Sequence, residues 1–487
     1  MLNGPAVGCP AFVGPFYPRQ CGQVSLCNPS CCNPHSSPIV AQGLGRTVEG
    51  EIMVKIFVGN SIEILPTLPA ESVHCVVTSP PYWSLRDYSL PLTVWGGDPT
   101  CAHVWGPEMT QHQRGQVGEH STLEGGPQAG GNGRLRQARQ GQFCQRCGAW
   151  CGCLGLEPTP DLYVAHLVEV FREVRRVLRG DGTCWVNLGD SYASSPQIDN
   201  YADPKASRRT PDGRCRTASV KPKDLVGIPW RVAFALQADG WWLRSAVVWH
   251  KPNCMPESVT DRPTNDYEFV FLLAKSERYF YDSAAIAEGA KQPNGKAELT
   301  GQHKRGQLQN LSGSTLGTNQ GAATRNRRAV WTIPTTGFKG AHFAVFPPAL
   351  VEPCVKSGTS ERGACPKCGA PWERIIKSTG HKNNREPAHV PGNSDTKTDS
   401  TGWQPTTVDT DDWQPTCNCA AGDPIPCTVL DPFGGAGTTA LQADRLQRDA
   451  ILIELNPDYA EMARQRIKAD GGMFTTVEIE EQHVPTT

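Results

Sequence analysis

The run that most restricts the fold of this chain places an apolar strand, a glycine-rich turn, a helix and a second apolar strand in succession. Residues 427–437 read CTVLDPFGGAG, and the next apolar strand ends at Glu454, 23 positions after Asp431. Glycines let a ligand approach the turn, and the helix that follows offers unpaired N–H groups. A carboxylate at the end of the second strand can accept hydrogen bonds from ribose hydroxyls. The run predicts an α/β fold with a nucleotide-type site, although a tight turn without ligand has the same pattern.

The rest of the chain supports an α/β class. Strand-like stretches at 53–60 and 73–78 flank a short helical one, and an amphipathic helix is expected at 161–179, closed by Gly180. Another helix at 229–239 and further apolar strands follow. Strands that alternate with helices predict a mostly parallel sheet with helices on both faces.

A second motif directly follows the apolar strand VHCVV. It consists of Ser79, Pro80, Pro81 and Tyr82. Two prolines stiffen the backbone at the edge of the sheet where open α/β folds place their chemistry. The plainer interpretation is a rigid loop with a packed aromatic ring, and the glycine turn elsewhere in the chain makes that interpretation weaker.

Together the two motifs resemble the β group of DNA amino-methyltransferases, the family that acts on cytosine N4 or adenine N6. The family's catalytic tetrad reads Ser79 to Tyr82 here, and its cofactor run reads Asp431 to Gly437. The catalytic motif comes before the cofactor motif, as in that group. The resemblance implies a Rossmann-like, S-adenosylmethionine-dependent methyltransferase fold with circularly permuted motif order.

The resemblance also implies roles for these residues. Ser79 and the Pro80 carbonyl would accept hydrogen bonds from the target amine, and Tyr82 would stack on a base extruded from the duplex. S-adenosylmethionine is the implied methyl donor. Its expected contacts are Asp431, Pro432, Phe433, Gly435, Gly437, Thr438, Glu454, Phe346 and Asn60, where Asn60 stands in place of the family's usual Asp.

Serine at the first tetrad position is the form most often seen in enzymes that methylate the N4 amine of cytosine. We therefore expect a site-specific DNA methyltransferase acting on cytosine N4, with adenine N6 as the alternative. An alternative of another class is a catalytically inactive, zinc-stabilised DNA-binding protein. The intact tetrad and glycines argue against it.

Two groups of cysteines carry the spacing of structural zinc ligands. The first group is Cys101, His103, Cys144 and Cys147, with Cys151 and Cys153 as competing ligands, and the second is Cys365, Cys368, Cys417 and Cys419. Four ligands in two close pairs give the closed tetrahedral site that folds a loop with little apolar core. We expect two structural Zn²⁺ ions; the alternative is loop cysteines that merely cluster.

The net charge of −1 excludes a uniformly basic coat but leaves room for local basic surfaces that contact DNA. The candidates lie in two clusters, Arg208, Arg209 and Arg214, and Arg325, Arg327 and Arg328. The target-recognition region is expected at 283–340. Ordinary solvated loops are the alternative interpretation.

We expect nine regions along the chain. They are a poorly ordered extension at 1–52, catalytic core at 53–100 and 155–282, zinc insertions at 101–154 and 361–424, the recognition region at 283–340, a cofactor-pocket helix at 341–360, the cofactor-binding part at 425–475 and a tail at 476–487.

The chain lacks a secretory signal pattern, and no apolar run approaches the roughly 18 residues of a membrane span. Eight of its 20 cysteines fall in close pairs, which favours metal ligands over disulfides. These features predict a protein of the cytoplasm of a bacterial or phage-infected cell, without membrane contact. A companion restriction endonuclease is a further expectation.

Overall fold

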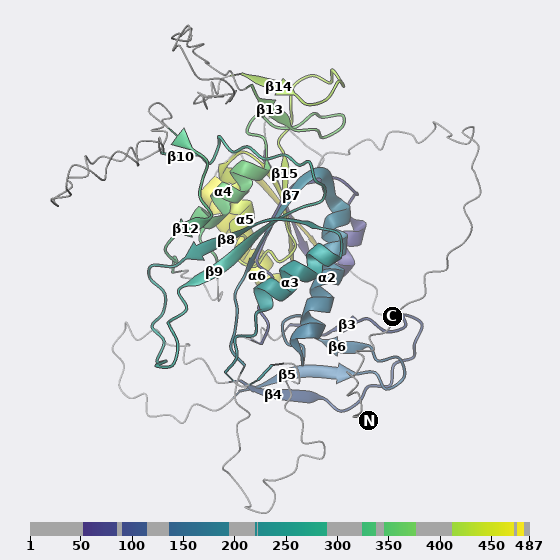
Figure 1. Ribbon diagram of the computed structural model, residues 1–487. Coiled ribbons are helices and arrows are strands. Elements are labelled where there is room, and N and C mark those ends of the chain that lie inside the picture. Colours follow the sequence, from purple (N-terminus) through teal and green to yellow (C-terminus); the bar gives the residue numbers. More distant parts are fainter. Residues whose placement is uncertain are drawn as a thin grey trace, which may run out of the picture. The chain divides into compact units, whose positions relative to one another are not determined.

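The computed structural model describes residues 52–84, 90–113, 136–193, 220–221, 223–289, 324–337, 345–375, 412–471 and 475–481. A nine-stranded sheet forms their core (Figure 1). Its strands are β1 (Ile52–Val58), β2 (Val73–Thr78), β7 (Leu178–Leu188), β8 (Trp242–His250), β9 (Tyr267–Ala274), β12 (Val330–Thr332), β15 (Thr428–Asp431), β16 (Asp449–Glu454) and β17 (Thr475–Glu481).

The spatial order of the strands is β12-β8-β9-β7-β2-β15-β16-β1-β17. All neighbours are parallel except β9, which is antiparallel to both β7 and β8. From the centre, the chain proceeds outward in one direction from β15 to β16 and in the other from β2 to β7. The order thus reverses between β15 and β2, and open α/β sheets bind ligands at such a point, outside the carboxyl ends of the strands.

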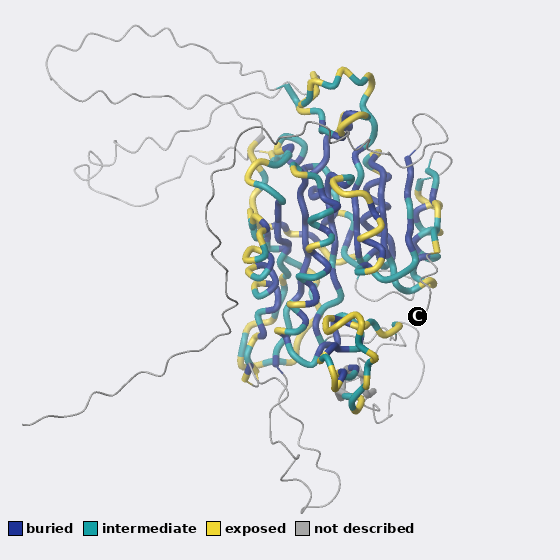
Figure 2. The backbone as a smooth tube through the Cα atoms, turned by 90° about the vertical axis from the view of Figure 1, so that its right-hand side faces the viewer, coloured by how far each residue is buried: buried dark blue, intermediate teal, exposed yellow. Residues whose placement is uncertain are grey.

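Helices cover both faces of the sheet. On one face, α1 (Ser61–Ile64), α2 (Pro160–Val177) and α3 (Ile228–Ala238) bury the side chains of Val76, Val186 and Ile453. On the other, α4 (Pro348–Gly358), α5 (Thr438–Arg445) and α6 (Pro457–Gly471) bury those of Val54, Val77 and Leu452. Figure 2 shows these strands as the most buried part of the backbone. The continuous apolar runs of the sequence follow from burial on both faces.

The amphipathic helix α2 begins as predicted but ends earlier. Thr159 caps it by accepting a hydrogen bond from the Leu162 N–H. The prediction that Gly180 closes this helix is wrong, because the chain turns to extended conformation at Leu178 and Gly180 lies inside β7. Leu178 pairs with Val73 of β2, and this strand pairing outweighs the helical pattern.

Three smaller sheets lie outside the main one. One contains β3 (Thr93–Trp95), β4 (Met109–Gln113), β5 (Arg136–Phe143) and β6 (Trp150–Gly152), so part of the insertion expected at 101–154 is strand. The others pair β10 (Glu288–Gly289) with β11 (Thr324–Arg325), and β13 (Trp372–Arg374) with β14 (Trp413–Pro415). A 3-10 turn, η1 (Leu65–Thr67), follows α1. Among the described residues, no helix has the length and apolar character needed to cross a bilayer.

Candidate active site and metal clusters

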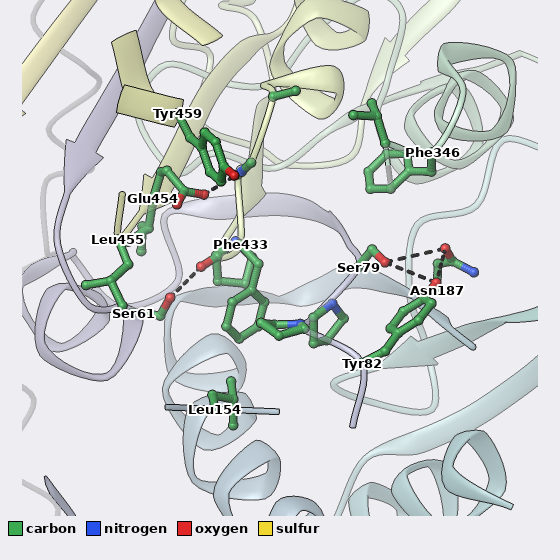
Figure 3. A pocket seen from close by; sticks show the side chains of 18 of the residues that line it. Ser61, Ser79, Tyr82, Leu154, Asn187, Phe346, Phe433, Glu454, Leu455 and Tyr459 are labelled. Carbon is green, nitrogen blue, oxygen red and sulfur yellow. Dashed lines mark hydrogen bonds between the residues drawn. The ribbon is translucent and has the colours of Figure 1, made fainter. Parts of the chain in front are cut away.

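A cavity of about 520 Å³ opens at the carboxyl ends of the central strands. All four tetrad residues line it, together with seven of the predicted cofactor residues, namely Asn60, Phe346, Pro432, Phe433, Gly435, Thr438 and Glu454. In Figure 3, Glu454 and Tyr459 lie on one side of this cavity and Ser79, Tyr82 and Asn187 on the other. The parallel strands therefore bring together two motifs that are some 350 residues apart in sequence.

Asp431 does not line the cavity, although it is a predicted cofactor contact. Its buried carboxylate accepts hydrogen bonds from the Thr78 hydroxyl (2.7 Å), the Phe433 N–H (3.0 Å) and the Thr439 hydroxyl (2.8 Å). Burial raises the pKa of Asp431 to about 7, and these three donors oppose the shift. Asp431 therefore ties the glycine turn to β2 and α5.

Gly437 also lies outside the cavity lining. It caps the N-terminus of α5 with a φ of 72°, a conformation that favours glycine. A Cβ at this position would lie 2.8 Å from the Cβ of Ala463 in α6. The glycine thus serves the close packing of two helices beneath the site.

Glu454 presents its carboxylate at the end of β16. One oxygen accepts from the Gly435 N–H (2.7 Å) and the other from the Asn456 N–H (2.9 Å). Burial raises the pKa of this carboxyl, while the backbone donors lower it. A carboxylate oxygen has further acceptor capacity, so Glu454 can still receive hydrogen bonds from a ligand.

Asn60 lines the same cavity but is already engaged. Its side-chain oxygen accepts from the Ile62 N–H (3.3 Å) and caps α1, and its amide donates to the Thr93 hydroxyl (2.6 Å). Nearby, the Ser61 hydroxyl donates to the Pro432 carbonyl and fixes the turn after β15. Ser61 is a site residue that the sequence motifs do not indicate.

The tetrad side chains meet a polar network from two other strands. The Tyr82 hydroxyl donates to Glu268 (2.8 Å) and lies 3.0 Å from the amide oxygen of Asn187, and the Ser79 hydroxyl lies 3.5 Å from that oxygen. Asn187 donates to Glu268 (3.1 Å), whose other oxygen pairs with Lys251. Burial and the Glu268 carboxylate hold the pKa of Tyr82 well above its usual value.

The sequence motifs do not indicate the three residues of this network. Asn187 lies in β7, Glu268 in β9, and Lys251 directly after β8. The available signal is a polar residue inside an otherwise apolar strand, as in CWVNL and YEFVFLL. Which of these polar residues face the tetrad depends on the strand order, which only the structure supplies.

The backbone of the tetrad is fixed from behind. The Pro81 carbonyl accepts from the Tyr163 hydroxyl of α2 (2.8 Å), and the Trp83 indole donates to the Glu157 carbonyl (2.9 Å). Among the described residues, no donor contacts the Pro80 carbonyl. That carbonyl is therefore available to a ligand in the cavity.

The first predicted metal group is assembled beside this cavity. The ligand atoms of Cys101, His103, Cys144 and Cys147 all lie within 4.8 Å of one another. Cys101 and His103 lie between β3 and β4, and Cys144 and Cys147 lie between β5 and β6. Thr93, Trp95 and Cys153 of this region line the cavity. Cys153 instead directs its thiol to the carbonyls of Leu90 and Pro91 (3.3 and 3.6 Å).

The second group, Cys365, Cys368, Cys417 and Cys419, is equally compact. It is anchored at the amino ends of the strands, far from the tetrad along β2. His74 donates to the Gly369 carbonyl (2.9 Å) while its Nδ1 accepts from the Thr428 N–H (3.0 Å), and Arg179 donates to the Cys368 carbonyl (2.8 Å). Burial lowers the pKa of His74 to about 4, so the imidazole is neutral.

The predicted DNA-contacting arginines are only partly described. Arg208, Arg209 and Arg214 lie outside the described residues. Arg325 and Arg328 both pair with Glu288 (3.0 and 2.7 Å), and the Arg327 guanidinium lies over the Trp331 ring at 4.8 Å.

The fold and the site define a class of protein, an α/β enzyme with a nucleotide-type ligand site next to a group of hydrogen-bond acceptors. A family model described as DNA methylase, that of the N6/N4 methyltransferases, matches residues 73–365 and 427–465. The Type II methyltransferase M.SmaI of Serratia marcescens is 32% identical over 414 residues, 85% of this chain and 90% of that protein. M.XycI of Xanthomonas campestris pv. cyanopsidis, another Type II methyltransferase, is 31% identical over 440 residues, 89% of this chain and 96% of that protein.

A solved structure, the PvuII DNA methyltransferase (cytosine-N4-specific), covers 88% of this chain and 97% of its own, at 13% identity and a TM-score of 0.40. The family model and the two sequence relatives show that the chain belongs to the N6/N4 DNA methylase family, as the motifs predict. It is a DNA methyltransferase.

Proposed function

We propose that this protein transfers a methyl group from S-adenosylmethionine to the N4 amine of a cytosine extruded from DNA. The observation that carries the proposal is the division of one cavity into two sides. Glu454, Phe433 and Tyr459 offer a nucleoside-type ligand site, and Ser79, Asn187 and Glu268 offer acceptors to an amine. Serine at the first tetrad position favours cytosine over adenine.

The chain's residues fit the cofactor. The Glu454 carboxylate retains acceptor capacity for ribose hydroxyls, and Phe346 and Phe433 provide aromatic surface for an adenine ring. A cavity of about 520 Å³ lies in the range of small-molecule sites. The bound cofactor would supply a methyl group activated by the sulfonium sulfur.

The acceptor side prepares the amine. An exocyclic amine is conjugated with its ring, so its lone pair is a poor nucleophile. The Asn187 oxygen 3.5 Å away can accept a hydrogen bond from the Ser79 hydroxyl, which leaves the serine lone pairs free to accept hydrogen bonds from the amine. Together with the Pro80 carbonyl, Ser79 favours a pyramidal nitrogen and stabilises the positive charge that develops on it.

Tyr82 would support the extruded base. Its hydroxyl is held by Glu268 and Asn187, and its ring lies against Gly189, where a Cβ would come within 2.5 Å of Cε2. A ring fixed at both ends presents a constant face on which a base can stack.

Nucleoside mass spectrometry tests the proposal. Unmethylated DNA is incubated with the purified protein and S-adenosylmethionine and then digested to nucleosides. We expect N4-methylcytosine; N6-methyladenine would establish the alternative target. No methylated base, on DNA long enough to contain any short site, would favour the inactive DNA-binding protein.

We also propose that each cysteine group holds a structural Zn²⁺. Tetrahedral zinc with bonds of about 2.0–2.3 Å requires ligand atoms roughly 3.4–3.8 Å apart. The pairs Cys101–Cys144 (4.0 Å) and Cys147–His103 (3.4 Å) are close to that spacing. Elemental analysis should find two zinc ions per chain, and a protein with none would contradict the assignment.

For DNA contact we propose the basic clusters at 205–223 and within 283–340, with a companion restriction endonuclease as partner. Among the described arginines of this set, Arg325 and Arg328 pair with Glu288, whereas the Arg327 guanidinium lies over the Trp331 ring. Replacing an arginine that contacts a phosphate should weaken the binding of DNA of any sequence. It should also reduce the slope of log K against log salt concentration by about one.

A further inference from the structure

We propose that a buried pair, Glu157 and His166, is the positioning unit that holds the catalytic loop, residues 79–84, in its working geometry. Neither residue lines the cavity. The pair lies behind the loop, with Glu157 just before helix α2 and His166 within it. The inference rests on the proposed function, because it assigns the pair a role in that reaction.

The residues around Glu157 form a second layer beneath the loop. The Gly155 carbonyl accepts from the Ser84 N–H (2.7 Å), and the Glu157 carbonyl accepts from the Trp83 indole (2.9 Å). Gly155 has a φ of 94°, and a Cβ there would lie 3.2 Å from the Pro81 Cβ. This segment therefore packs directly against the backbone of the loop.

The Glu157 side chain fixes that layer. One carboxylate oxygen accepts from the Gly155 N–H (2.8 Å), and the other meets Nδ1 of His166 at 3.0 Å. The two side chains are 0% and 3% exposed. Separating a buried carboxylate from its partner costs free energy. The position of the Glu157 side chain is therefore set by the position of the His166 ring.

His166 is in turn held by two tryptophans. Its ring stacks on Trp95 of β3 at 4.7 Å and on Trp150 of β6 at 5.2 Å. Trp95 also lines the cavity. One helical turn earlier in α2, Tyr163 donates to the Pro81 carbonyl. Helix α2, the small sheet and the loop thus meet at this one pair.

The consequence for catalysis is geometric. Ser79 and the Pro80 carbonyl must present their acceptors to an amine that is in line with the methyl donor. A displacement of about 1 Å can cost roughly 100-fold in rate. A change at the pair should therefore reduce the rate of methyl transfer much more than it reduces binding of the cofactor.

The test uses His166→Phe in the full-length protein, because phenylalanine keeps a ring between the tryptophans and removes Nδ1. We expect kcat, and the single-turnover rate constant of methylation, to fall about 10- to 100-fold. The Kd of S-adenosylmethionine, measured by calorimetry, should stay within about threefold. Glu157→Gln keeps one acceptor oxygen, so its kcat should fall less than that of His166→Phe.

The matched control is Asp282→Asn. Asp282 is a buried carboxylate that pairs with Arg374 at 2.6 Å and does not line the cavity. This variant should melt at a lower temperature with unchanged kcat.

If His166→Phe and Glu157→Gln lose stability but keep wild-type kcat and KM, the pair is merely structural and the inference is wrong. Should His166→Phe fail to fold, the kcat of Glu157→Gln decides in the same way. Wild-type protein that binds the cofactor but methylates no DNA would overturn the proposed function, and this inference with it.

Discussion

At the scale of single residues, the two carboxylates of the glycine-turn region have different roles. Both carboxylates accept hydrogen bonds on both oxygens, but Asp431 is buried beneath the glycine turn and does not line the cavity, whereas Glu454 does. Both stand at strand ends in the sequence, and only their surroundings separate a positioning carboxylate from a ligand contact.

Asp431→Asn should remove part of the pH dependence of stability. The folded protein holds the pKa of this carboxyl at about 7, above the unfolded value of about 3.9. The folded state then binds more protons, so its stability falls as pH rises from about 4 to about 7, by about 1.4 kcal/mol per unit of pKa difference. The site can accommodate asparagine at position 431. The Thr439 hydroxyl can donate to the Val77 carbonyl and accept a hydrogen bond from the asparagine amide.

Urea unfolding at pH 5 and pH 7.5 measures this effect. Wild-type protein should lose more stability between the two pH values than the variant does. Equal losses would show that Asp431 titrates normally.

Ser79→Ala should lower kcat by about 10²- to 10³-fold, the usual loss for one preorganised group at a developing charge. The Kd of S-adenosylmethionine should be unchanged. Ser61→Ala is the matched comparison on the cofactor side, where the hydroxyl holds the Pro432 carbonyl, and it should weaken cofactor binding instead. Unchanged turnover in Ser79→Ala would remove that residue from the mechanism.

At the scale of helices and strands, close approach between α5 and α6 depends on Gly437. A Cβ there would lie 2.8 Å from Ala463, and φ is 72°. Gly422 has a φ of 84° with no atom within 4 Å of its Cβ position, so it isolates the conformational part of the effect.

Gly437→Ala should therefore destabilise the protein by about 2–5 kcal/mol, the sum of strain and overpacking. Gly422→Ala should cost about 1 kcal/mol from strain alone. Thermal unfolding of the two variants provides the measurement, and equal losses would contradict a packing role for Gly437.

The sequence predicts the α/β class, both motifs and the composition of both cysteine groups, because each depends on residues close together in the chain. Gly180 is misread because pairing of Leu178 with another strand ends the helix first. Asn187, Glu268 and Lys251 are missed because they meet the tetrad through strand order, a long-range property. The small sheet of β3 to β6 is missed where its strands are polar.

At the scale of the whole molecule, the two cysteine groups differ in location. The first adjoins the cavity through β3 and β6, and the second is fastened to the amino ends of β2 and β7 by His74 and Arg179. Their loss should therefore have different consequences.

With one Zn²⁺ in each cysteine group, as we propose, Cys147→Ser and Cys417→Ser should each reduce the zinc content from two ions to one. We expect Cys147→Ser to weaken cofactor binding and lower kcat, because the cavity wall loses its support. Cys417→Ser should mainly lower the unfolding temperature. Zinc analysis, calorimetric titration and melting curves on both variants would check this, and indistinguishable kcat values would contradict it.

The position of β15 and β16 in the middle of the sheet sets the order in which the molecule can be completed. β1 pairs only with β16 and β17, and β2 receives one of its two partners from β15. Among the described strands, β1 is synthesised first, and it gains a neighbour in the sheet only when β16 and β17 follow. Until then two strand edges stay open to chaperones or to misassembly. The cofactor-binding residues that we propose stand on β15, β16 and the segments next to them, so we expect a nascent chain without these strands to transfer no methyl group.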